Sequence, residues 1–264
     1  MNIFIRELKA NRKALIIWSA CMALFVLAGM SKYTAYSAGG ASADVFNDMS
    51  KTMRAMLGIA DFDVSVMSGF FAFLFPYIEV TVGIHAAILG AGMIAKEERD
   101  KTTEFLIVKP VSRAAIITSK LLAALVNVAV INIVTLLSSL AMVPVYNKGE
   151  DISAEIIMFL VSMFIVQLIF LSLGALLAAL LRKPKASGSI ATGVLLSAYV
   201  ISKVTDINED LNVINIFSPL KYFSLTRIVN GDGLDLVIVL LCLLLIGIFS
   251  ALTYFFYLRR DLNV

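Results

Sequence analysis

Long apolar runs, separated by short polar and charged segments, form the dominant pattern along the chain. A helix needs about 20 apolar residues to cross the roughly 30 Å hydrocarbon core of a bilayer. Six stretches reach or approach that length: residues 14–30, 68–95, 114–145, 156–181, 187–204 and 234–258. The pattern therefore predicts an all-α, polytopic membrane protein with six transmembrane helices.

The second and third stretches are longer than a bilayer requires. Residues 68–95 would extend about 42 Å as a helix at 1.5 Å per residue, and residues 114–145 would extend further. The sequence from Glu97 to Lys120 is strongly charged. We therefore expect both helices to continue past the membrane surface and to present their connecting segment to a soluble partner.

Two polar segments are expected to hold additional helices. Residues 1–13 alternate apolar and basic side chains, which is typical of an interfacial helix on an anionic membrane surface. In residues 31–67, apolar side chains recur at helical spacing as far as Leu57, and Gly58 follows as a stop signal. The second segment therefore predicts a short amphipathic helix on the outer face.

A further outer helix is expected in residues 205–233. Ser218 precedes Pro219, a proline suited to a first helical turn, and Gly231 ends the stretch. No internal repeat or low-complexity linker divides the chain, so we expect residues 1–264 to form a single transmembrane domain.

The placement of charge predicts the orientation. The formal net charge is only +3. However, if the chain crosses the membrane six times, the segments on the same side of the membrane as the N-terminus hold 15 of the 22 Lys and Arg residues. The same segments hold only 6 of the 19 acidic residues. Cytoplasmic loops are enriched in Lys and Arg, so both termini are expected inside the cell (N-in/C-in). A cleavable signal peptide is an alternative for the first span, although no small-residue cleavage site follows it.

Composition agrees with a membrane protein and narrows the chemistry. Apolar residues make up 60% of the chain and the mean hydropathy is +0.92, whereas soluble domains average about 45–50% apolar residues. Two cysteines without a C-x-x-C spacing provide neither a disulfide framework nor a zinc site, so no metal is expected. The small net charge indicates no nucleic-acid partner. No phosphate-binding loop, dinucleotide fingerprint or zinc-protease motif occurs.

The second span carries two polar residues and a small-residue stripe. Glu79 and His85 are candidates for a translocation pathway, because an ionisable group at membrane depth usually faces a cavity or a partner. Hydration near the outer interface is the alternative for Glu79, and a structural hydrogen bond is the alternative for His85. Gly83, Ala87 and Ala91 continue from Glu79 at four-residue spacing, which indicates close helix packing.

Residues 96–113 are the most informative segment. Glu97 and Glu98 suit a helix N-terminus, and Pro110 would end that helix. Phe105 and Leu106 form an apolar edge in an otherwise charged stretch. A solvated loop would not explain such an edge between two overlong helices, whereas a docking helix does.

The run KEERDKTTEFLIVKPVSRAAIITSK, residues 96–120, closely resembles the cytoplasmic segment of ABC type 2 transporter permeases. The family pattern has paired acids, Gly/Ser-Thr, a Glu-Leu-Leu-like stretch, Pro-x-x-Arg and a later Lys. The matching positions are Glu97, Glu98, Thr103, Glu104, Phe105, Leu106, Pro110, Ser112, Arg113 and Lys120. Thr102 departs from the pattern, where the family often has Gly or Ser. The resemblance also covers MRAMLGI before the second span and FSPLKYF before the sixth.

The resemblance implies a transport mechanism. Residues 96–113 would act as a coupling helix that inserts into a groove of a separate ABC ATPase subunit, through Glu97, Glu98, Thr103, Glu104, Phe105, Leu106, Pro110 and Arg113. Two permease copies, expected as a homodimer in the cell membrane, would each dock one ATPase. ATP and Mg²⁺ would be held by those ATPases and no cofactor by this chain. Spans one, two and five would line the pathway, and the expected activity is export of an amphipathic peptide, lipid or drug-like molecule.

Three other functions are consistent with parts of the sequence. A secondary transporter could move protons through Glu79 and His85. A non-transporting sensor or immunity partner could bind an ATPase and a ligand without moving either across the membrane. An intramembrane enzyme would need a nucleophile and base that the residues do not provide.

Overall fold

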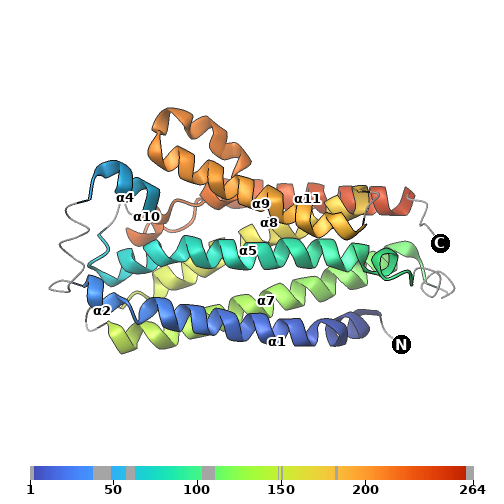
Figure 1. The fold of residues 1–264 in the computed structure, drawn as a ribbon, viewed down its shortest axis with the longest axis horizontal. Helices are drawn as coiled ribbons and strands as arrows, with labels where there is room; N and C mark the ends of the chain where they lie inside the picture. The colour runs from blue at the N-terminus through green and yellow to red at the C-terminus, as the bar shows by residue number, and fades with distance from the viewer. Residues whose placement is uncertain are drawn as a thin grey trace.

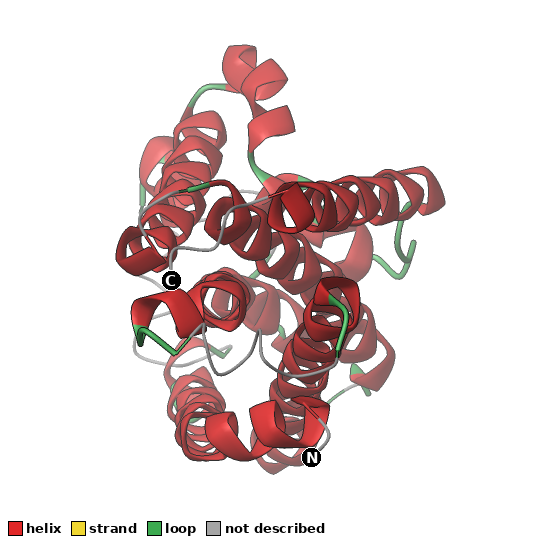
Figure 2. Cartoon of the chain, turned by 90° about the vertical axis from the view of Figure 1, so that its right-hand side faces the viewer, coloured by secondary structure: helices red, strands yellow, loops and turns green. Residues whose placement is uncertain are grey.

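The fold is a bundle of long helices (Figure 1). The computed structural model describes residues 3–37, 49–57, 63–102, 111–147, 149, 151–181 and 184–259. Within these ranges, six helices are long and apolar enough to cross a membrane. They are α1 (Ile3–Met30), α5 (Met67–Arg99), α7 (Arg113–Tyr146), α8 (Ser153–Leu180), α9 (Pro184–Ile207) and α11 (Leu236–Arg259). The described residues contain no strand (Figure 2), which confirms the predicted all-α, six-span class.

Short helices gather at the end of the bundle opposite the N-terminus of α1 and the C-terminus of α11. Figure 1 shows α2, α4 and α10 together at that end. The short elements are α2 (Tyr33–Tyr36), α4 (Lys51–Leu57), η1 (Glu209–Phe217), η2 (Pro219–Lys221) and α10 (Leu225–Val229). The predicted outer helix that ends at Leu57 corresponds to α4, and Gly58 lies outside the described residues.

Two boundaries differ from those expected from the sequence. Residues 1–13 were expected as an interfacial helix, but the described part of this segment runs without a break into the first span as α1. No Gly or Pro interrupts residues 3–28, so nothing in the local sequence ends the helix before the apolar run. The single helix expected from Ser218 to Gly231 is divided into η2 and α10, because the Ser224 side chain accepts from the backbone N–H of Arg227 and starts a new helix.

The two helices that flank the charged segment are long, as expected. α5 contains 33 residues and α7 contains 34, so each extends about 50 Å. This exceeds the roughly 30 Å hydrocarbon core by several turns. Their connecting ends at Arg99 and Arg113 can therefore extend beyond the bilayer.

Close backbone contact holds α5 against α8. A Cβ added to Gly174 of α8 would lie 2.3 Å from the backbone oxygen of Ala87, and one added to Gly90 would lie 2.0 Å from that of Leu171. Ala87 and Ala91 lie at this contact, while Gly83 faces Leu195 of α9. Lipid tails are as apolar as the helix surfaces, so the hydrophobic effect does little to bring helices together within a membrane. Small residues stabilise helix packing there because they let the two backbones approach closely. The α5–α8 pair is therefore the tightly packed centre of the bundle.

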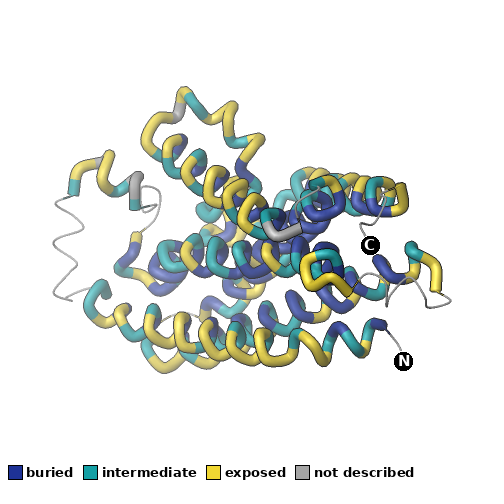
Figure 3. The backbone as a smooth tube through the Cα atoms, turned by 45° about the vertical axis from the view of Figure 1, so that its right-hand side comes forward, coloured by how far each residue is buried: buried dark blue, intermediate teal, exposed yellow. Residues whose placement is uncertain are grey.

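Burial decreases outward from this pair. Most of α5 is buried, whereas α1 exposes one side along its length (Figure 3). On α1, Ile16 and Ile17 are exposed, and on α11 the same holds for Leu236 and Val237. Exposed apolar side chains in a membrane bundle can face lipid or another membrane-spanning chain, so α1 and α11 form part of the apolar outer surface of this bundle.

The α5–α8 contact predicts a sharp difference between two glycines in membrane spans. Gly174→Ala forces α8 away from the Ala87 backbone and should destabilise the protein by about 1–3 kcal/mol, as overpacking does. Gly247 of α11 has no atom within 4 Å of its Cβ position, so Gly247→Ala is the matched control and should leave thermal unfolding of the purified chain unchanged. Equal melting temperatures for Gly174→Ala and the wild type would contradict the packing described above.

Candidate functional site

The predicted coupling residues lie partly in the described structure. Glu97 and Glu98 were expected at the start of a helix, but they lie in the last turn of α5, because that helix continues to Arg99. Arg113 is the first residue of α7. The remaining predicted positions, namely Thr103, Glu104, Phe105, Leu106 and Pro110, lie outside the described residues. What the structure defines is the pair of helix ends from which this segment leaves the bundle.

A buried lysine joins those two helix ends. Lys120 of α7 has no exposed surface, and its Nζ donates to Glu97 Oε2 at 2.6 Å and to the backbone oxygen of Met93 at 2.5 Å. Both acceptors belong to α5. The side chain therefore ties α7 to the last turns of α5, on the bundle side of the predicted coupling segment.

The first helix joins the same ion pair. Glu7 of α1 is fully buried and accepts from Arg6 Nη2 at 2.8 Å and from Lys96 Nζ at 3.2 Å. Arg6 Nη2 also donates to Glu97 Oε1 at 3.2 Å. The five residues Arg6, Glu7, Lys96, Glu97 and Lys120, called here the charge cluster, thus connect the ends of α1, α5 and α7 in one network.

The charge cluster restrains the relative positions of the ends of α1, α5 and α7, because separating either buried carboxylate from its basic partners would destabilise the fold. Removing one member of a buried ion pair leaves an uncompensated charge, which typically costs about 3–5 kcal/mol. Sequence reasoning placed Glu97 in a docking surface and missed Glu7. One signal in the sequence could have identified Glu7: it is the single acidic residue in the otherwise basic start of α1. A buried acidic side chain is almost always paired, so a basic partner would be expected for it.

The end of α5 is shaped by a left-handed residue. Lys101 has a φ of 55°, and the backbone N–H of Thr102 donates to the oxygen of Glu97 at 2.8 Å. This is the hydrogen bond of a Schellman C-cap, in which glycine usually takes the left-handed position. α5 therefore ends abruptly, and the chain turns away from the helix axis at Lys101.

The start of α7 is fixed by a cap and by a contact with the last helix. The Ser112 side chain accepts from the backbone N–H of Ala115 at 3.2 Å, which is a typical N-cap. The hydroxyls of Thr118 and Tyr254 lie 2.8 Å apart, and Arg113 Nη1 donates to the oxygen of Leu258 at 3.5 Å. The end of α11 therefore lies beside the start of α7.

The two candidate pathway residues do not interact with each other. Glu79 is buried, and none of the described residues donates a hydrogen bond to its carboxylate. His85 is also buried, and its ring centroid lies 5.0 Å from that of Trp18 on α1. Its Nδ1 has no hydrogen-bond partner among the described residues. Both roles considered for His85, in a pathway or as a structural histidine, therefore stay predictions.

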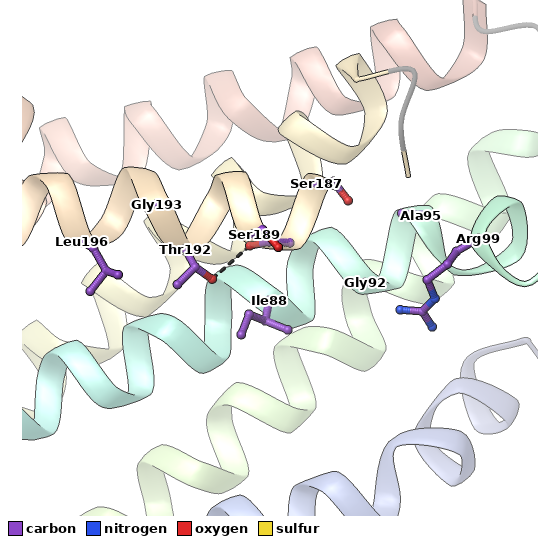
Figure 4. A pocket seen from close by; sticks show the side chains of 10 residues that line it. Ile88, Gly92, Ala95, Arg99, Ser187, Ser189, Thr192, Gly193 and Leu196 are labelled. Carbon is purple, nitrogen blue, oxygen red and sulfur yellow. Dashed lines mark hydrogen bonds between the residues drawn. The ribbon is translucent and has the colours of Figure 1, made fainter. Parts of the chain in front are cut away.

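A cavity of about 480 Å³ lies between α5 and α9. Figure 4 shows Thr192, whose hydroxyl donates to the backbone oxygen of Gly188, on the α9 side and Ile88 on the α5 side. A Cβ added to Gly92, Gly188 or Gly193 would have no atom of the described residues within 4 Å. The lining residues are Ile88, Gly92, Ala95, Arg99, Ser187, Gly188, Ser189, Thr192, Gly193 and Leu196. Unlike the glycines at the α5–α8 contact, those in this cavity leave space that the described residues do not fill.

A second cavity of about 330 Å³ lies on the other flank of α5, against α1. It is lined by Ala10, Asn11, Ala14, Trp18, His85, Ile88, Leu89, Gly92, Met93, Lys96 and Arg99. Ile88, Gly92 and Arg99 line both cavities. One face of α5 is thus open toward α1 and α9, while another face is locked against α8.

The pairing of Lys120 with Glu97 predicts that a single substitution destabilises the protein and that a second substitution restores stability. Lys120→Met should destabilise the protein by about 1.5–3 kcal/mol, the usual contribution of a hydrogen bond to a charged group, because Glu97 stays buried and, among the described residues, keeps only its contact with Arg6. The double variant Lys120→Met/Glu97→Gln removes both charges and should recover most of that loss. Thermal unfolding of purified variants checks this, and a single variant as stable as the wild type would show that the pair does not hold the helix ends.

Comparison with known proteins assigns the family. No curated protein matches the sequence. A protein-family model described as "ABC-2 family transporter protein" matches residues 1–262, nearly the whole chain and all six long helices. The chain therefore belongs to the ABC-2 transporter family: it is a multi-pass membrane protein and a permease component of an ABC transporter, with an ABC ATPase subunit as its partner.

Proposed function

We propose that the chain is the permease of an ABC exporter and that residues 96–113 couple it to the ATPase subunit. Both termini face the cytoplasm, and two copies of the chain form the transport unit with one ATPase on each. ATP and Mg²⁺ are held by the ATPases, and this chain contributes no catalytic residue. The exported molecule is amphipathic: a peptide, a lipid or a drug-like compound.

The observation that carries the coupling proposal is the charge cluster. Force applied by an ATPase to residues 96–113 reaches the bundle through the ends of α5 and α7. Because Lys120 joins these ends and Arg6 joins Glu97 to α1, the three helix ends move together. A loosely held loop would absorb the same displacement.

The open face of α5 supports the proposed pathway. The cavities on its two flanks are lined by α1, α5 and α9, the same three spans that the family resemblance implies. Gly188 and Gly193 leave unfilled space on α9, which a second permease copy or a substrate can occupy. ATP-driven movement of α5 would change both cavities at once, since Ile88, Gly92 and Arg99 belong to both.

Substitutions in the coupling segment test the proposal. Phe105→Ala removes the apolar edge and should weaken binding to the ATPase about thirtyfold, as expected for a buried aromatic contact worth roughly 2 kcal/mol. Glu98→Lys should also weaken the complex and lower its ATP turnover. Asp232→Lys, a charge reversal at an exposed site at the opposite end of the bundle, is the control. Unchanged complex formation and ATP turnover in both coupling variants would refute the coupling role.

A buried Glu79 without a hydrogen-bond donor keeps the proton-coupled alternative testable. In sealed vesicles with a fluorescent amphipathic dye, export should require the ATPase and ATP, and Glu79→Gln should retain it. Transport that persists without an ATPase and is lost in Glu79→Gln would replace the proposal with a proton-driven mechanism. ATPase binding with no dye movement would favour the sensor or immunity role.

A further inference from the structure

The cavity between α1 and α5 has the dimensions of a ligand site. Its volume of about 330 Å³ lies within the usual range for ligand pockets, about 300–1,000 Å³. Along α5 it extends from His85 to Arg99, a rise of about 21 Å. On the α1 side the cavity is bordered by the small side chains of Ala10 and Ala14. Both residues are exposed, so the cavity is open to the surroundings on this side.

Away from the helix ends, this cavity is lined mainly by apolar side chains, and it contains one buried polar atom without a partner among the described residues. Trp18, Ile88 and Leu89 line it. His85 is only 5% exposed, and its Nδ1 has no hydrogen-bond partner in the part of the chain that the structure describes. Buried polar atoms in proteins are nearly always hydrogen-bonded to protein or water. A ligand with a hydrocarbon chain could contact the apolar lining of this cavity. Its oxygen atoms, or a water molecule bound with it, could form a hydrogen bond with the imidazole of His85.

The end of the cavity near Lys96 and Arg99, on the proposed cytoplasmic side, is basic. Lys96 and Arg99 line it; Lys96 Nζ donates to Glu7 at 3.2 Å and Arg99 Nε to Asp100 at 3.0 Å. The two terminal amino groups of Arg99 have no acceptor among the described residues. The Arg99 side chain extends back toward Gly92 (Figure 4). Six basic and four acidic residues occupy positions 3–14 and 93–100, so this end carries a net positive charge after its internal pairs are counted.

We propose that the α1–α5 cavity binds an anionic phospholipid of the cytoplasmic leaflet. The phosphate lies at Arg99, and an acyl chain lies along Ile88 against Trp18. Basic pockets between transmembrane helices on the cytoplasmic side bind anionic headgroups in this way. The lipid enters sideways past Ala10 and Ala14. This cavity also flanks the proposed pathway, but lipid binding in it requires neither the ATPase nor transport and rests only on the proposed orientation of the chain in the membrane.

The chain provides its own reporter for this site. Trp18 is the only tryptophan among the 264 residues, and it lines the cavity. The full chain is reconstituted into nanodiscs that contain phosphatidylglycerol or phosphatidylcholine brominated on the acyl chains, and quenching of Trp18 fluorescence is measured. Brominated phosphatidylglycerol should quench at a lower mole fraction than brominated phosphatidylcholine. Equal quenching by the two lipids would overturn the proposal.

Two substitutions and a matched control identify the headgroup contact. Arg99→Gln should lower the preference for the anionic lipid about fivefold, the contribution of one basic residue near the membrane surface. Arg99→Lys should retain most of that preference. Arg227→Gln is the control, because Arg227 is also 47% exposed and paired with an aspartate, Asp235, at 3.1 Å, but lies at the opposite end of the bundle. A preference that persists in Arg99→Gln, or that falls equally in Arg227→Gln, would contradict the assignment.

A soluble headgroup distinguishes a lipid site from a phosphate site. Glycerol phosphate at millimolar concentration should leave quenching by brominated phosphatidylglycerol unchanged, because the acyl chain supplies much of the contact. Displacement by glycerol phosphate alone would show that the cavity recognises free phosphate and would refute the lipid proposal. Since neither result depends on the ATPase, loss of this inference would leave the coupling proposal intact.

Discussion

The buried pairing of Lys120 with Glu97 is the interaction on which the working arrangement of this permease depends. Charges buried at the edge of a bilayer must be paired or they destabilise the fold. Here the pairing extends through Arg6 and Lys96 to Glu7. Three helices that are far apart in sequence are therefore fixed at one end. The predicted coupling segment leaves the bundle from two of them, so its anchorage combines this ion-pair network with the hydrophobic contacts of the same helix ends, such as that of Ile3 with Ile116.

α5 connects this anchorage to the rest of the molecule, and its faces have different physical properties. One face is locked to α8 by Gly90 and Gly174, where backbones approach so closely that a methyl group does not fit. Another face is open, with Gly92 next to unfilled space and cavities on both sides. A helix that is rigid against α8 and unfilled on its other flank can transmit movement along its length while changing the space around it. This combination fits a permease better than a protein whose helices are packed on every side.

The sequence predicted the features that depend on local composition. The six spans, the excess length of α5 and α7 and the short helix ending at Leu57 follow from runs of apolar residues and their stop signals, because hydropathy and helix signals act over neighbouring residues. The division of the stretch from Ser218 to Gly231 was missed, since the cap at Ser224 competes with a continuous helix. Thr103 to Pro110 lie outside the described residues, so the coupling contact itself stays a prediction.

Features that depend on distant residues could not be predicted in the same way. Glu7 and Glu97 are separated by most of a span, an outer segment and another span, and nothing in the local sequence of either indicates that Arg6 bridges them. Similarly, the small-residue stripe of α5 was recognised, but which glycine meets which helix depends on the neighbour that packs there. Gly90 meets α8, whereas Gly92, two residues later, faces open space. Helix contacts of this kind are properties of the assembled bundle.

The most direct test of the account is the distance between the ends of α1 and α7 during ATP turnover. Spin labels at Lys9→Cys and Ala115→Cys, both exposed positions, in a Cys21→Ala background would report it by pulsed electron paramagnetic resonance on the assembled complex. The labelled chain is diluted with excess unlabelled permease, so that each complex contains at most one labelled copy. If the charge cluster makes these ends one unit, the distance distribution is narrow and unchanged between the nucleotide-free and ATP-bound complexes. A shift or a second distance on ATP binding in the wild-type background would show that the ends move separately, and the coupling mechanism proposed here would be wrong.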